Sequence, residues 1–162
     1  PGMHGANRSG RPFTGDYAGI LLYATLHRFG LATAARSIGV DDGLRLVGCR
    51  ITNAVKCLPP QNKPELAEIK RCNRYLQTEL SALRRGSAVL ALGTIAHQAV
   101  LMAIDAKKSL FPFGHGARHA LPNGLALYDS YHCSRYNTNT RRLTPAMFEA
   151  VCADISNHVQ SC

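Results

Sequence analysis

Apolar residues recur along this chain with two spacings, one typical of helices and one typical of strands. From Tyr17 to Phe29 the apolar positions recur at helical spacing. Asp16 stands where a helix N-cap is expected, and Gly30 is a residue type that commonly ends a helix. Further helices are predicted at 64–85, at 93–106 and from Thr144-Pro145 onward.

Short apolar runs predict three strands, at 46–55, 87–92 and 125–131. The run at 87–92 is wholly apolar and bounded by glycines, as is typical of a central parallel strand. Strands that alternate with helices predict an α/β fold, here a three-layer α/β/α sandwich with a mostly parallel central sheet. Because ligands bind at the carboxyl ends of such strands, the loops at 53–63 and 132–142 are expected to carry function.

The composition is that of an ordinary globular protein. The chain has 162 residues, of which 46% are apolar and 18% charged, and this suits one domain spanning 1–162. No apolar run in the sequence is long enough to cross a membrane, so we expect no membrane partner.

The charge balance narrows the choice of partner. Nineteen Lys and Arg against ten Asp and Glu give a formal net charge of +9. This excess favours a polyanion such as nucleic acid, because neutralised phosphates release their counterions. An ordinary basic protein with no such partner would also have this charge.

The first sixteen residues form a loop rich in glycine and basic groups. Such a loop can bring backbone N–H groups close to a phosphate or a base. A solvated surface loop is the other interpretation; Asp16 would then be only a helix cap, and Phe13 only an anchor in the core.

Two strand ends carry polar side chains. Asn53 offers a donor and an acceptor together, which is what a base edge requires, although it could equally satisfy its own loop. His132 is followed by Ser134, Arg135 and Asn137, and this grouping can reach both a polar ligand and a phosphate backbone.

Six cysteines occur in the chain, and their number alone does not fix their role. With no export signal in the sequence, an intracellular setting with reduced thiols is expected. Cys57 and Cys72 are separated by fourteen residues and could be half of a cluster or zinc site. They could also be ordinary buried thiols.

Taken together, these segments resemble the uracil-DNA glycosylase superfamily in its iron–sulfur branch, most nearly the family 5 (type b) enzymes. The matching segments are PGMHGANRSGRPFTGD at 1–16, ITNAVKCLPPQNKP at 51–64, ALGTIAH at 91–97, PFGHG at 112–116 and YHCSRYNTNTRRLTPAMF at 131–148. Five motifs in the same order are a specific resemblance that covers nearly the whole chain.

The resemblance implies a DNA repair enzyme that flips uracil out of DNA and hydrolyses its N-glycosidic bond. By this resemblance Asp16 activates the attacking water, and His132 stabilises the departing base. Phe13 stacks on the flipped base and Asn53 reads its edge. Whether other deaminated bases are also removed is left open by the sequence.

The resemblance also implies residues that hold the DNA and a cofactor. Those expected at the DNA are Arg8 and Arg11 in the first loop and Ser134, Arg135 and Asn137 in the loop after His132. Cys57 and Cys72 correspond to two of the four ligands of a [4Fe–4S] cluster. The other two belong to a CxxC segment upstream of the first motif, so we expect this chain to lack its first strand and that segment.

Further expectations follow from the same resemblance. We expect a monomer that acts on DNA in the cytoplasm, associated with the nucleoid. Cys133 stands where the family has proline, which removes a fixed backbone angle from the loop. A protein that binds or covalently traps uracil-DNA without turnover is the alternative, and a non-catalytic iron–sulfur or DNA-scaffold module is a second one.

Overall fold

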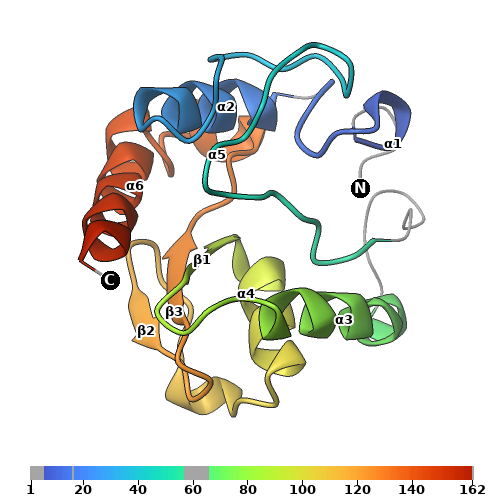
Figure 1. Ribbon diagram of the computed structural model, residues 1–162, viewed down its shortest axis with the longest axis vertical. Helices are drawn as coiled ribbons and strands as arrows, with labels where there is room; N and C mark the ends of the chain where they lie inside the picture. The colour runs from blue at the N-terminus through green and yellow to red at the C-terminus, as the bar shows by residue number, and fades with distance from the viewer. Residues whose placement is uncertain (1–5, 16, 57–65, 162) are drawn as a thin grey trace.

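The computed structural model describes residues 6–15, 17–56 and 66–161 (Figure 1). Its elements are α1 (Ala6–Ser9), α2 (Ala18–Arg28), α3 (Leu66–Ser81), β1 (Ala88–Leu92), α4 (Thr94–Ala103), the short 3-10 helix η2 (Lys108–Leu110), β2 (Arg118–Ala120), β3 (Ala126–Ser130), α5 (Arg135–Asn139) and α6 (Pro145–Gln160). The predicted α/β class is confirmed. No helix in the described part of the chain is both long and apolar enough to span a membrane.

The described strands form one sheet in the order β1-β3-β2. β1 pairs with β3 in parallel, and β2 pairs with β3 antiparallel, so this sheet is mixed rather than mostly parallel. The sequence reading missed β2 because its three residues, Arg-His-Ala, carry no apolar alternation. The parallel pairing predicted for 87–92 is confirmed, but among the described strands β3 is the middle one and β1 lies at an edge.

Helices lie against both faces of the sheet, because side chains alternate along each strand. Ala91 and Leu127 face one way and pack with Leu80 of α3 and Leu101 of α4. Tyr128 faces the other way and packs beneath α6. Figure 1 shows α3 and α4 beyond one side of the sheet, with α6 and α2 on the other.

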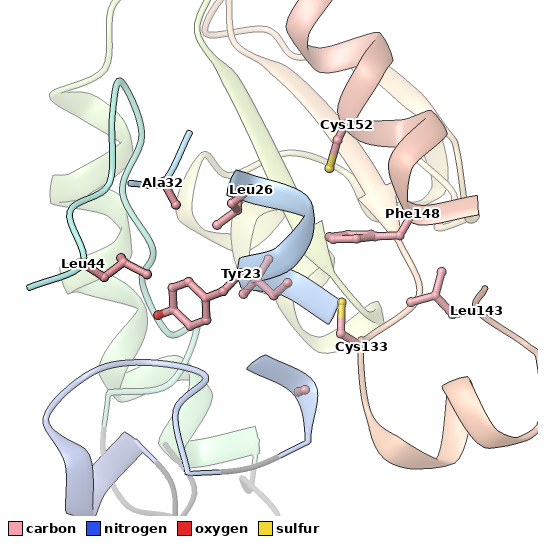
Figure 2. Close-up of a cluster of buried hydrophobic side chains, with 10 residues drawn as sticks. Tyr23, Leu26, Ala32, Leu44, Cys133, Leu143, Phe148 and Cys152 are labelled. Atoms are coloured by element: carbon pink, nitrogen blue, oxygen red, sulfur yellow. The ribbon is translucent and has the colours of Figure 1, made fainter. Parts of the chain in front are cut away.

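A third cluster lies where α2, α6 and the loop before α5 meet (Figure 2). Tyr23, Phe148, Leu143 and Cys133 are each exposed by 1% or less and pack together there. The predicted helix at 17–29 therefore exists because one side of it fills this core. Gly30, with φ of 71°, ends it as expected, while its N-cap is Tyr17 without a side-chain cap.

The strand predicted at 46–55 is not formed. The segment makes one isolated antiparallel bridge, between Ala32 and Leu46, and otherwise runs without a ladder partner in the described chain. Gly48 has a left-handed φ of 64°, which interrupts an extended backbone, and Val47 is half exposed. The apolar residues of this segment instead belong to a loop, and Leu46 and Ile51 of that loop pack against the core.

Candidate active site

Two of the predicted site residues, far apart in sequence, lie side by side. The rings of Phe13 and His132 have their centroids 5.7 Å apart and their planes tilted by 35°. Phe13 comes from the loop before α2, and His132 follows β3. The first loop and the carboxyl end of β3 therefore meet at one place.

The backbone of Phe13 is held against α2. Phe13 has a left-handed φ of 58°, which is uncommon for a bulky residue. Any Cβ on Gly19 would overlap the carbonyl oxygen of Phe13, so only glycine allows the loop to lie this close to the helix. The hydroxyl of Tyr23 donates to the carbonyl of Pro12 at 2.7 Å and fixes the neighbouring peptide.

Arg11 holds the first loop to a second loop at 37–44. Its guanidinium donates to the carbonyl oxygens of Gly39 at 3.0 Å, Val40 at 3.0 Å and Leu44 at 3.1 Å. It also lies 3.3 Å from a carboxylate oxygen of Asp42. The donors of Arg11 therefore point into the protein, and this arrangement supports the Phe13 loop.

Asp42 organises that second loop. Its carboxylate accepts hydrogen bonds from the Ser37 hydroxyl at 2.7 Å and from the backbone N–H groups of Ile38 at 2.7 Å and Leu44 at 3.0 Å. These bonds, first that of Ser37, hold the pKa of Asp42 well below its usual range. Asp42 is therefore a fixed negative charge opposite Arg11.

His132 lies between the start of α4 and the start of α5, and contacts from both position it. Gly93, at the N-cap of α4, has a φ of 91°, and a Cβ there would come within 3.4 Å of the His132 Cβ. The Asn137 amide donates to the His132 carbonyl at 2.8 Å, and the Ser134 hydroxyl caps α5 by accepting from the Asn137 N–H at 3.4 Å. Ser134 and Asn137 thus shape the His132 loop in addition to their predicted role at DNA.

Two pockets flank the Phe13–His132 pair. One, of about 290 Å³, lies between the start of α4 and the His132 loop, and Gly93, Phe113, His132, Asn137 and Arg142 are among its lining residues. The other, of about 430 Å³, includes Phe13, Tyr17, Arg36, Ile38 and Arg135 in its wall. His132 lines the first pocket and Phe13 the second, so the ring pair separates them.

Basic side chains border both pockets. Arg135 is exposed, and its guanidinium lies 5.7 Å from the centre of the Tyr17 ring. Arg142 lies 4.5 Å from the centre of the Tyr131 ring. Arg8 is exposed on α1. Arg142 was not predicted as a site residue, although the pair Arg141-Arg142 at the end of the loop at 132–142 was a usable signal.

Asn53 stands apart from this arrangement. It lines neither of the two pockets, and its carbonyl accepts from the Lys56 ammonium at 3.4 Å. Lys56 also bonds the Thr52 hydroxyl and pairs with Glu79 of α3 at 3.0 Å. Burial raises the Glu79 pKa, but Lys56 and the other partners outweigh it and leave that pKa lowered. The Asn53 loop is thereby joined to α3.

The cysteines differ in their suitability as cluster ligands. Cys57, the other expected cluster ligand, lies outside the described residues, and so does the predicted catalytic residue Asp16. Cys72 is 2% exposed on α3, a position that shields a thiolate ligand from water. Burial raises the pKa of Cys133 and of Cys152 to about 12, and both are thiols packed in the apolar core (Figure 2). Cys72 offers the thiol that an iron–sulfur cluster takes as a ligand, and its place among the ligands stays a prediction.

Comparison with known proteins decides the family. Residues 1–156 match the sequence description of the uracil DNA glycosylase superfamily. The chain belongs to this superfamily. Its uracil-DNA glycosylase motifs are those that bring Phe13 and His132 together.

Individual uracil-DNA glycosylases are similar over most of this chain. A type-5 uracil-DNA glycosylase of Thermus thermophilus is 49% identical over 148 residues, which are 91% of this chain and 67% of that protein. A type-5 uracil-DNA glycosylase of Mycobacterium tuberculosis is 43% identical over 153 residues, which are 93% of this chain and 57% of that protein. A type-4 uracil-DNA glycosylase of Pyrobaculum aerophilum is 34% identical over 96 residues, 59% of this chain and 41% of that protein. The chain thus spans from little more than half to about two thirds of these type-5 relatives.

Proposed function

We propose that this protein is a monofunctional uracil-DNA glycosylase, which removes uracil from DNA by hydrolysis and leaves an abasic site. The observation that carries the proposal is the contact between the Phe13 and His132 rings, within a chain that belongs to this superfamily. An aromatic face beside a hydrogen-bonding imidazole is what a flipped pyrimidine requires. Removal of other deaminated bases from the same pocket extends this proposal.

Phe13 binds the flipped base. A base inside a duplex is out of reach, so the enzyme rotates it into the site at a cost of a few kcal/mol. Stacking on an aromatic ring returns about 1–3 kcal/mol per base. The packed loop around Phe13 places the ring before the base arrives, so little of this energy is lost to ordering the side chain.

His132 and Asp16 carry the bond cleavage. Departure of uracil leaves negative charge on the base and positive charge on the sugar. A preorganised donor at His132 stabilises the base anion, and the carboxylate of Asp16 orients the water that attacks the sugar. Asn53 reads the base edge, which requires the Asn53 loop to close on the base when DNA binds.

The DNA backbone is held by the basic border of the two pockets. Arg8, Arg135 and the loop residues Ser134 and Asn137 contact phosphates and sugars, and such contacts position the duplex without reading its sequence. Arg142 joins this group because it lines the pocket beside His132. Arg11 acts indirectly, by fixing the Phe13 loop.

Cys57 and Cys72 provide two thiolates of a [4Fe–4S] cluster. When bound, the cluster supplies a covalent link between the Cys57 segment and α3, and hydrolysis needs no redox step. Residues 1–162 form one domain with the three-layer α/β/α arrangement. The protein acts as a monomer on DNA in the cytoplasm, at the nucleoid.

A strand-cleavage assay tests the proposal. Full-length protein is incubated with an oligonucleotide that carries one uracil, and alkali then cuts the product at any abasic site. Asp16→Asn and His132→Ala are expected to lose cleavage, each by at least about 100-fold. His27→Ala, an exposed histidine on α2 away from the site, is the matched control and retains it.

The outcomes separate the possible functions. Cleavage that survives in both site variants overturns the assigned roles. Tight binding of uracil-DNA with no abasic product indicates a non-turnover binding or trapping protein. Neither binding nor cleavage by the wild type refutes the proposed activity.

A further inference from the structure

Three polar side chains, two buried and one partly buried, converge next to Phe113, which lines the same pocket as His132. His97 of α4 and Asp129 of β3 are 2% and 0% exposed, and the side chain of His119 in β2 is 12% exposed. The His97 Nδ1 lies 2.8 Å from Asp129 Oδ1, and the His119 Nε2 lies 3.3 Å from Asp129 Oδ2. One ligand-type atom from each residue falls within 4.8 Å of the others.

The contacts of the two His97 ring nitrogens require either an extra proton or a metal ion in this cluster. Its Nε2 lies 2.9 Å from the carbonyl oxygen of Phe111, which only accepts, so Nε2 carries a hydrogen. In the neutral ring Nδ1 then has a lone pair, and this faces the carboxylate of Asp129. Two lone pairs at 2.8 Å repel each other unless the two atoms share a proton or bind the same metal ion side by side.

A proton satisfies this cluster only in part. A proton on His97 Nδ1 serves the Asp129 Oδ1 alone. The His119 Nε2 is buried and makes no hydrogen bond of acceptable geometry, although it lies near Oδ2. An unpaired buried polar atom costs about 1–3 kcal/mol. One metal ion could bind a ligand atom from each of the three residues at once.

We propose that His97, His119 and Asp129 bind one divalent transition-metal ion, with Zn²⁺ as the best match. Imidazole nitrogens and a carboxylate are ordinary zinc ligands. The Nε2–H bond of His97 to the Phe111 carbonyl is the outer contact that typically orients a metal-bound histidine. The Gly114 N–H donates to Asp129 Oδ2 at 3.4 Å and orients the carboxylate in the same way. With both carboxylate oxygens engaged, the three residues offer four ligand atoms.

The site would lock the pocket wall in place. It joins α4, β2 and β3, and the chain between its outer contacts, Phe111 and Gly114, includes Phe113, which lines the pocket beside His132. The ring of Phe113 meets that of His97 edge-on at 5.6 Å between centroids. This ion is separate from the cysteine-bound cluster and does not depend on the proposed glycosylase activity.

The test measures zinc bound per chain. Purified full-length protein is titrated with ZnCl₂ after removal of loosely bound metal, and bound zinc is counted by mass spectrometry of the metal. His119→Phe removes the ligand nitrogen but keeps an aromatic ring against Phe111, and Asp129→Asn keeps the shape but removes the charge. Both variants are expected to bind one equivalent less than the wild type. His27→Ala, a distant exposed histidine, binds as much as the wild type, and the cysteines are the same in all four proteins.

Cobalt gives the second readout. Co²⁺ at the site should show visible bands without thiolate charge transfer, and His119→Phe should lose these bands while its circular dichroism stays native. Because His119 is the least buried of the three, this variant tests the site even where Asp129→Asn fails to fold. Equal zinc and cobalt binding by the wild type and a folded His119→Phe overturns the proposal and leaves His97 and Asp129 as a hydrogen-bonded pair.

Discussion

At the scale of single residues, the ring of Phe13 is set by its backbone as much as by its neighbours. The left-handed φ of 58° aims the side chain from the first loop toward His132. Phe13→Ala should lower kcat/KM on uracil-DNA by about 10-fold to 100-fold, the equivalent of about 1–3 kcal/mol of stacking. Steady-state assays measure this, with Phe13→Tyr as the variant that keeps the aromatic face. Equal losses in the two variants would contradict the stacking role.

Asp42 predicts a pH dependence of stability. Its folded pKa is lowered by Ser37 and the loop N–H groups, so its contribution is present above the unfolded value of about 3.9 and is lost as pH falls below it. At pH 7 Asp42→Asn should be about 1.5–3 kcal/mol less stable than the wild type. Denaturant unfolding from pH 7 to pH 3 should show this difference shrinking.

The neighbouring carboxylate is the control for this prediction. Asp41 is exposed, and Asp41→Asn should change stability by less than about 0.5 kcal/mol across the same range. A gap between wild type and Asp42→Asn that stays constant with pH would argue against the charged hydrogen-bond network.

The sequence identified Phe13 and His132 because both stand in motifs whose order and residue types are specific. It could not show what Arg11 does. Its partners, Gly39 to Leu44, are about thirty residues away, and an arginine that binds carbonyls looks the same in sequence as one that binds phosphate. The His97–Asp129–His119 cluster was missed for the same reason, since three separate elements contribute to it.

At the scale of elements, Gly19 reverses an ordinary expectation. Replacing glycine with alanine inside a helix usually stabilises it by about 1 kcal/mol. In α2 the added Cβ would overlap the Phe13 carbonyl, so Gly19→Ala should lower Tm and displace the first loop. Gly39→Ala, where the Cβ would make only ordinary contact, should leave Tm nearly unchanged; thermal melts followed by circular dichroism compare them. A higher Tm for Gly19→Ala would contradict the close contact.

The elements that the sequence predicted are those with a long periodic pattern and clear ends. The Thr144 hydroxyl accepts a hydrogen bond from the Met147 N–H at 3.2 Å, and Pro145 follows it. These two residue types predicted the start of α6 correctly. α5 has five residues and is held by Ser134 and tertiary contacts, so it has no pattern of its own. The apolar run at 46–55 has the composition of a strand but lacks a partner strand in the described chain. Composition does not show whether a segment will find such a partner.

At the scale of the whole molecule, the net charge of +9 predicts salt-sensitive DNA binding. The logarithm of the binding constant should fall linearly with the logarithm of salt concentration. Arg135→Ala should reduce that slope by about one and weaken binding similarly on all sequences. Fluorescence anisotropy with an abasic-site analogue measures both. An unchanged slope would place Arg135 away from the phosphates.

The contact of Gly19 with Phe13 also limits how the site can move. Because the Phe13 carbonyl packs directly on Gly19, moving the first loop away from α2 would break this contact and the hydrogen bond from Tyr23 to the Pro12 carbonyl. On the other side of the site, α5 has no buried residue, and Leu143 beyond it lies in the core. Local opening should therefore cost less free energy in α5 than in the buried first turn of α2, and hydrogen exchange should be faster in α5.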